Sequence, residues 1–326
     1  MKRSMTVATA IVLMSSCAAF ASDNIGDVTN KVNAGYIGSA AYNYGGYDYG
    51  FGPEAVAGGV SVKNSYNIGD VTNKVDAGWI YAYAEGTSET EDGTTAVAGG
   101  VSVRESSDIG DISNKVAAGG LEAYAGGDWG TSAVAGGVDI KGSGSHYIGD
   151  VTNNASAGYI AASAWGYGAS AAAGGIGLRD AWYVGDVSNK VSAANIVASA
   201  VGSNATAAAG GISVTDYAQY IGDITNKVTA GGDIIAYAWP DGATATAGGV
   251  VVKSSNGVGN ITNKIDAGGS IYAEANGFNS IAAAGGVDIQ YASNVDDVTN
   301  SVSAGDIYAI ASGDGMTSVS GSVVVR

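Results

Sequence analysis

Residues that usually supply chemistry or covalent stability are scarce in this chain. Its 326 residues include one cysteine (Cys17), one histidine (His146) and two prolines, and only 13% of them are charged. A single cysteine cannot form an internal disulfide, and one histidine leaves little material for metal or nucleophilic chemistry. Yet 46% of the residues are hydrophobic, which is too many for a solvated disordered segment. The chain is therefore expected to bury a core of small residues without covalent cross-links.

The N-terminus, residues 1–21, carries the pattern of a cleaved signal peptide. Lys2-Arg3 precedes an apolar stretch over residues 5–14, and Ala19-Phe20-Ala21 provides the small-x-small pattern of a cleavage site. This predicts a mature chain of residues 22–326 that is secreted or held at the cell surface. A lipoprotein attached through Cys17 is the alternative. The apolar stretch is shorter than the roughly 20 residues that span a bilayer, so no transmembrane segment is expected in the mature chain.

The charge of the mature chain excludes one class of partner. Removing Lys2 and Arg3 from 14 basic residues leaves 12 against 30 acidic residues, a formal net charge of −18. A polyanion of this size is repelled by nucleic acids and by anionic lipid surfaces. Nucleic acid is therefore not an expected partner.

One segment, Ile-Gly-Asp-Val-Thr-Asn-Lys-Val, occurs eight times with few changes, and its acidic position, which is asparagine at Asn260, is spaced by 43, 41, 39, 36, 37, 37 and 37 residues. A diglycine follows later in each of the first seven units, whereas the last unit has Ser320-Gly321. Repetition at such a period indicates a repeat architecture. The asparagine of the segment never changes and stands at Asn30, Asn73, Asn114, Asn153, Asn189, Asn226, Asn263 and Asn300. The predicted repeats are 24–66, 67–107, 108–146, 147–182, 183–219, 220–256, 257–293 and 294–326.

Each repeat contains three stretches in which residue character alternates with a period of two, as in the second repeat over 70–77, 79–84 and 96–103. This period predicts strands, because alternate residues of a strand face opposite sides of its sheet. Length varies only between these stretches, where a solenoid tolerates insertions. The sequence thus predicts an all-β fold: a single parallel β-solenoid, or β-helix, of eight repeats of 36–43 residues. Whether each repeat forms one wide coil or two smaller rungs stays open.

The invariant asparagine lies among inward valines, where an unpartnered amide would be destabilising. In a parallel stack, each asparagine can bond to the copies above and below, as in cross-β arrays. The eight asparagines are therefore predicted to form a structural ladder.

No catalytic, cofactor-binding or metal-binding residue is predicted. The acidic residues form a repeated ladder, and no single repeat carries an exceptional pair such as glycoside hydrolysis requires. His146 has no marked nucleophile and acid beside it. A looser acidic group, Glu85, Glu89, Glu91 and Asp92, keeps weak calcium binding open. A threonine and serine column flanked by charged columns keeps ice binding open as a weaker alternative.

Aromatic residues give the best indication of ligand binding. Trp79, Tyr81 and Tyr83 are predicted to face outward from one strand, where exposed rings suit contacts with carbohydrate or protein. The competing interpretation is that stacked tyrosines only stabilise the outer surface of the sheet.

The Gly-Asp-Val-Thr-Asn-Lys-Val segments, the asparagine column and the Ala/Gly-rich strands make the chain resemble bacterial secreted β-solenoids. More loosely, it is similar to curli-like functional-amyloid fibre subunits, whose repeats are shorter and carry glutamine where this chain has valine and alanine. The resemblance covers all eight repeats and implies a surface or matrix fibre used in adhesion or biofilm. Because no catalytic constellation stands out among the residues, neither enzymatic activity nor a cofactor is predicted.

Self-association is the predicted mode of assembly. The first repeat begins close to the predicted cleavage site, the last ends in Val323-Val324-Val325-Arg326, and neither end shows a capping segment. We therefore expect end-to-end polymerisation or a capping partner. The alternative hypothesis is a solenoid that displays side chains to a ligand, with a glycan or a surface as candidate and calcium or ice as weaker ones.

Overall fold

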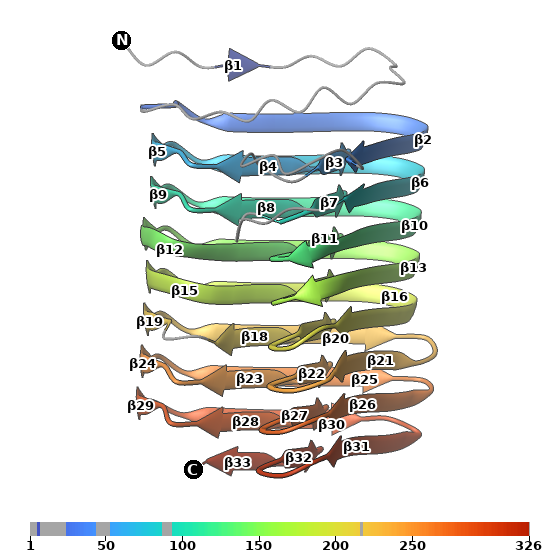
Figure 1. Ribbon diagram of the computed structural model, residues 1–326, viewed down its shortest axis with the longest axis vertical. Helices are drawn as coiled ribbons and strands as arrows, with labels where there is room; N and C mark the ends of the chain where they lie inside the picture. Colours follow the sequence, from blue (N-terminus) through green and yellow to red (C-terminus); the bar gives the residue numbers. More distant parts are fainter. Residues whose placement is uncertain (1–4, 7–23, 44–52, 87–92, 216–217, 326) are drawn as a thin grey trace.

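The computed structural model describes residues 5–6, 24–43, 53–86, 93–215 and 218–325, of which the side chains of 5–6, 43 and 142–146 are not described. The regular structure in these ranges consists of β-strands that stack as coils from one end of the molecule to the other (Figure 1). No helix in the described ranges is long and apolar enough to cross a membrane.

Each coil begins with a long strand. This strand bends at a corner and stays paired with the next coil on both sides of the bend. In the last three coils this strand is divided into two. These strands form a twelve-stranded sheet, the long sheet, together with β1 (Met5–Thr6). They are β2 (Val28–Asn43), β6 (Val71–Gly86), β10 (Ile112–Trp129), β13 (Val151–Tyr167), β16 (Val187–Val201), β20 (Ile224–Ala230), β21 (Ile234–Trp239), β25 (Ile261–Ala267), β26 (Ser270–Asn276), β30 (Val298–Ser303) and β31 (Asp306–Ser312).

A second, eight-stranded sheet, the alanine sheet, lies opposite the later part of the long sheet. It consists of β3 (Glu54–Ala57), β7 (Thr95–Ala98), β11 (Ser132–Ala135), β14 (Ser170–Ala173), β17 (Thr206–Ala209), β22 (Thr244–Ala247), β27 (Ile281–Ala284) and β32 (Thr317–Ser320).

The third sheet, the valine sheet, follows the diglycine of each repeat, or Ser320-Gly321 in the last repeat, and has thirteen strands. They are β4 (Val60–Lys63), β5 (Tyr66–Ile68), β8 (Val101–Arg104), β9 (Ser107–Ile109), β12 (Val138–Ile148), β15 (Ile176–Val184), β18 (Ile212–Thr215), β19 (Gln219–Ile221), β23 (Val250–Lys253), β24 (Asn256–Val258), β28 (Val287–Gln290), β29 (Ser293–Val295) and β33 (Val323–Val325).

Every pairing between these strands is parallel, and all pairings except that of β1 join successive repeats at equivalent positions of their sequences. Asn30 is in register with Asn73, and Asn73 with Asn114. The predicted β-solenoid is therefore confirmed, and each repeat forms one wide coil rather than two rungs. Eight coils at about 4.8 Å per coil give a stack roughly 40 Å long.

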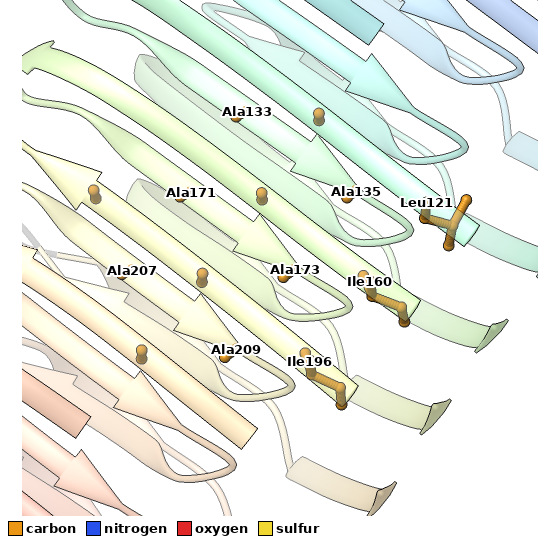
Figure 2. Close-up of a cluster of buried hydrophobic side chains, with 14 of the residues drawn as sticks. Leu121, Ala133, Ala135, Ile160, Ala171, Ala173, Ile196, Ala207 and Ala209 are labelled. Carbon is orange, nitrogen blue, oxygen red and sulfur yellow. The ribbon is translucent and has the colours of Figure 1, made fainter. Parts of the chain in front are cut away.

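Two apolar cores lie inside the coils. In the alanine core, inward alanines of the long and alanine sheets face one another beside a column that includes Leu121, Ile160 and Ile196 (Figure 2). In the valine core, the first inward residue of each long strand, such as Val71, packs against the valine sheet. Alanine is a weak strand former, but its small side chain lets the two sheets approach closely.

In the inner coils, the strands of the alanine sheet and the first valine-sheet strand after each diglycine are buried on both faces, as in β7 and β8, a feature the sequence analysis did not predict. Their outward sides pack on one another, as Val251 does on Ile281 and Ala283. This contact, which we call the seam, also buries polar groups. Asp139 is fully buried there and accepts a hydrogen bond from Ser132 Oγ at 2.7 Å.

The predicted leader lies mostly outside the described residues, as do Cys17 and the predicted cleavage site. Of residues 1–21, only Met5–Thr6 is described. This short strand, β1, pairs in parallel with Val28 and Thr29 at the first edge of the stack.

Candidate functional site

The structure places the eight asparagines of the repeated segment in one column along the stack. In each of the seven steps, Nδ2 of one asparagine donates to Oδ1 of the next at 2.8–3.0 Å. The six inner asparagines are buried. A buried amide needs partners for its polar groups, and the stack provides them.

The diglycine corner completes this asparagine ladder. The ladder lies between the two cores, and Nδ2 of Asn189 also donates to the carbonyl of Gly210 at 3.2 Å. Gly210 has a φ of +62°, and a Cβ there would stand 3.0 Å from Val228 Cγ1. Glycine is therefore required where the corner turns toward the asparagine.

A second ladder runs along the acidic position of each repeat. The backbone N–H of Asp111 donates to Asp70 Oδ1 at 3.0 Å, and that of Asp150 to Asp111 Oδ1 at 2.9 Å. The same bond recurs at every step from Asp27 to Asp297, including through Asn260. The carboxylates thus stabilise the stack by accepting from backbone N–H groups, although like charges lie in one column.

The two ladders run in opposite directions. In the asparagine ladder, the earlier coil donates and the later coil accepts. In the acidic ladder, the earlier coil accepts and the later coil donates. Within the described residues, the first edge of the stack therefore has the Asn30 acceptor and the Asp27 N–H donor. The last edge presents the complementary Asn300 donor and Asp297 acceptor.

Trp79, Tyr81 and Tyr83 alternate with the inward residues of β6 and lie on the outer side of the long sheet. Trp79 is exposed, while Tyr81 and Tyr83 are half-buried. The ring of Tyr83 stacks on that of Tyr124 in the next coil, with centroids 4.8 Å apart and planes 9° apart. Tyr83 Oη also donates to Glu85. Burial raises the pKa of Tyr81, and nearby phenols and Glu122 raise it further.

These three residues belong to a larger aromatic face that the sequence analysis recognised only in part. It comprises the outward residues of the later half of the long sheet, within 36–42, 79–85, 120–126, 159–165, 195–201, 233–239, 270–276 and 306–312. Register between the coils places its aromatic side chains together. They are Tyr36, Tyr42, Trp79, Tyr81, Tyr83, Tyr124, Tyr159, Trp165, Tyr237, Trp239, Tyr272 and Tyr308.

On the aromatic face, Tyr272 and Glu274 form a polar pair. Tyr272 Oη donates to Glu274 Oε2 at 2.6 Å, and Asn276 Nδ2 donates to Oε1 at 2.9 Å. The bond to Glu274, with burial as a smaller cause, raises the pKa of Tyr272 to about 12. The same bonds lower the pKa of Glu274.

A separate tyrosine ladder was missed by the sequence analysis. Tyr147, Tyr183 and Tyr220 stack at the corner before the long sheet, with centroids 4.9 and 4.8 Å apart. All three are exposed and have a positive φ, from +52° to +57°. Equivalent corners in other coils carry asparagine, aspartate or glycine, the residues that adopt this conformation most readily. That substitution pattern was the signal in the sequence.

The described residues contain no group of three or more His, Cys, Asp or Glu side chains that could hold a metal ion. The calcium candidates Glu89, Glu91 and Asp92 lie outside the described residues. His146 is part of β12, but its side chain is not described.

Comparisons with protein-family models, with curated proteins and with solved structures found no match to this chain.

Proposed function

We propose that this protein is an exported structural subunit that joins end to end into filaments at the cell surface or in an extracellular matrix, and that it catalyses no reaction. The single observation that carries the proposal is the complementarity of the two edges of the stack. The donor of each ladder at one edge has its acceptor at the other edge.

A second copy placed head to tail would continue both ladders without changing their direction. Asn300 Nδ2 would donate to Asn30 Oδ1 of the next copy, and Asp27 N–H of that copy would donate to Asp297. Head-to-head contact would instead bring acceptor to acceptor in the asparagine ladder. The last edge exposes parallel strands with unused backbone groups, and removal of β1 with the leader would expose the first edge in the same way, so polar head-to-tail stacking is the arrangement we favour.

Serine replaces alanine in the inward columns of the alanine core only in the two end coils. Two inward columns of the long sheet and two of the alanine sheet are alanine except at Ser39, Ser318 and Ser320. Ser39 Oγ is buried and has no hydrogen-bond partner within the described residues. Head-to-tail stacking would bring these serines into adjacent layers, where they could bond to one another.

Electron microscopy of the purified chain tests the proposal. Residues 22–326 should form unbranched filaments one molecule wide, with an axial period of about eight coils. The uncleaved chain should assemble less readily, because β1 pairs with Val28 and Thr29 at the edge that must stay free. Discrete rods roughly 40 Å long at every concentration would contradict the proposal.

A further inference from the structure

The two halves of the long sheet display different chemistry on the same scaffold. The outward residues of the earlier half are polar and charged, such as Thr72, Lys74 and Asp76. The later half carries the aromatic face, where Trp79, Trp165 and Trp239 are 37%, 51% and 37% exposed. Because the earlier half forms a stable sheet without aromatic residues, the fold itself does not require the rings on the later half.

The Trp79 ring on the aromatic face lies over a glycine of the next coil. A Cβ on Gly120 would stand 2.3–2.5 Å from three ring atoms of Trp79, which belongs to the preceding coil. A ring that covers the backbone in this way keeps one face against the protein and presents the other to solvent.

The charge on this face has one sign. Its outward positions include Glu85, Glu122, Asp233, Glu274 and Asp306, and the eight strand segments that define the face contain no outward lysine or arginine. Carboxylates accept hydrogen bonds from hydroxyl or ammonium groups and repel anions.

We propose that the aromatic face binds a polysaccharide of hexose units without anionic groups. The apolar C–H side of a hexose ring can lie on an exposed aromatic ring, while its hydroxyl groups bond to the interspersed carboxylates. An amino sugar would add a cation near the rings and carboxylates. A second copy of the face is a poor occupant, because stacking face on face would bring carboxylates together. An anionic membrane is excluded by the same charge.

Sedimentation with insoluble polysaccharides tests this inference. The purified chain should be retained by cellulose or chitin and not by an anionic alginate gel. Substituting Trp79→Ser, Trp165→Ser and Trp239→Ser together should weaken retention about tenfold or more. As a matched control, Tyr147→Ser, Tyr183→Ser and Tyr220→Ser remove three exposed rings from the tyrosine ladder and should leave retention unchanged.

A second variant changes the orientation of the Trp79 ring without removing the ring. Gly120→Ala places a methyl group where the Trp79 ring lies, so the ring must lift away and retention should fall. Filament formation, followed by microscopy on the same samples, reports assembly independently of binding. Equal retention of the triple tryptophan variant and the parent chain, or no retention by either polymer, would overturn the inference. If filaments of the parent chain associate side by side and those of the triple tryptophan variant do not, the aromatic face is a contact between filaments and the inference is overturned.

Discussion

At the scale of single residues, the asparagine ladder explains how a buried amide becomes stabilising. Asn226 accepts from Asn189 and donates to Asn263 and to the carbonyl of Gly248. Its side chain is fully buried, so each of these bonds replaces a contact with water. The benefit depends on the neighbouring coils, because one isolated repeat would leave the amide without partners.

Replacing Asn226 with alanine should therefore destabilise the stack by about 1–3 kcal/mol, since Asn189 loses an acceptor and Asn263 loses a donor. Urea unfolding followed by circular dichroism measures the effect. Thr225→Ala, on the adjacent exposed position, is the matched control and should change stability by less than about 0.5 kcal/mol. Equal effects from the two variants would show that the ladder contributes nothing specific.

The Tyr272–Glu274 pair predicts a pH dependence. Tyr272 should titrate at about 12, and Glu274→Gln should lower its pKa toward the ordinary value of 10. Because the folded-state pKa is raised, the contribution of Tyr272 to stability is complete below pH 10 and is lost as the pH rises through about 12. The pKa of Glu274 is lowered, so its contribution to the stability of the fold is complete above pH 4.5 and is lost as the pH falls below that value.

A nuclear magnetic resonance titration of ring-labelled tyrosine measures this prediction, with Tyr272→Phe to assign the signal. A Tyr272 signal that titrates at the same pH with and without Glu274 would contradict it.

At the scale of elements, the diglycine corner sets the shape of each coil. It joins the alanine sheet to the valine sheet and turns its carbonyl toward the asparagine ladder. Gly136 has a φ of +62°, and its Cβ position lies 2.6 Å from Leu121 Cδ1. The corner therefore has neither the backbone freedom nor the space for a larger residue.

Gly136→Ala should destabilise the protein by about 1–3 kcal/mol through left-handed backbone strain and overpacking. Gly35→Ala provides the control, because nothing lies within 4 Å of its Cβ position and its φ is not in the left-handed range. The two urea midpoints should differ clearly. A midpoint of Gly136→Ala equal to that of Gly35→Ala would show that the corner is adaptable.

The inward columns could be predicted from sequence because period-two alternation specifies which residues share a face. The change of phase between Ala77 and Ile80 was also visible, since both residues belong to inward sets three positions apart. The seam could not be predicted in the same way. Val97 and Ser102 lie on the outward sides of their strands, and only the tertiary path of the chain shows that these sides meet.

Prediction of the candidate site was similarly partial. Trp79, Tyr81 and Tyr83 stand out within one repeat, but most of the aromatic face arises from register between coils whose outward residues differ. The tyrosine ladder depends on a backbone conformation that tyrosine seldom adopts, so residue type alone pointed away from it.

At the scale of the whole molecule, the stack is a polar rod whose two edges differ. Within the described residues, Val298 and Val302 are only half-buried in the last coil, whereas their equivalents Val187 and Val191 in an inner coil are buried. A following copy in register would cover these residues and continue both ladders. The proposed polymerisation would therefore add apolar burial and hydrogen bonds of the kind that already hold the coils together.

Disulfide cross-linking at the proposed junction tests this central claim most directly. In the chain of residues 22–326, which contains no cysteine, Thr29→Cys and Thr299→Cys place cysteines at equivalent positions of the two end coils. Paired coils lie about 4.8 Å apart, within the range of a disulfide, whereas within one molecule the two positions are about 34 Å apart. The account predicts a ladder of covalent oligomers under mild oxidation. Little cross-linking is expected when Ser303→Cys replaces Thr299→Cys, or with Thr29→Cys alone. Dimers from Thr29→Cys alone, or equal cross-linking by the out-of-register pair, would contradict head-to-tail stacking.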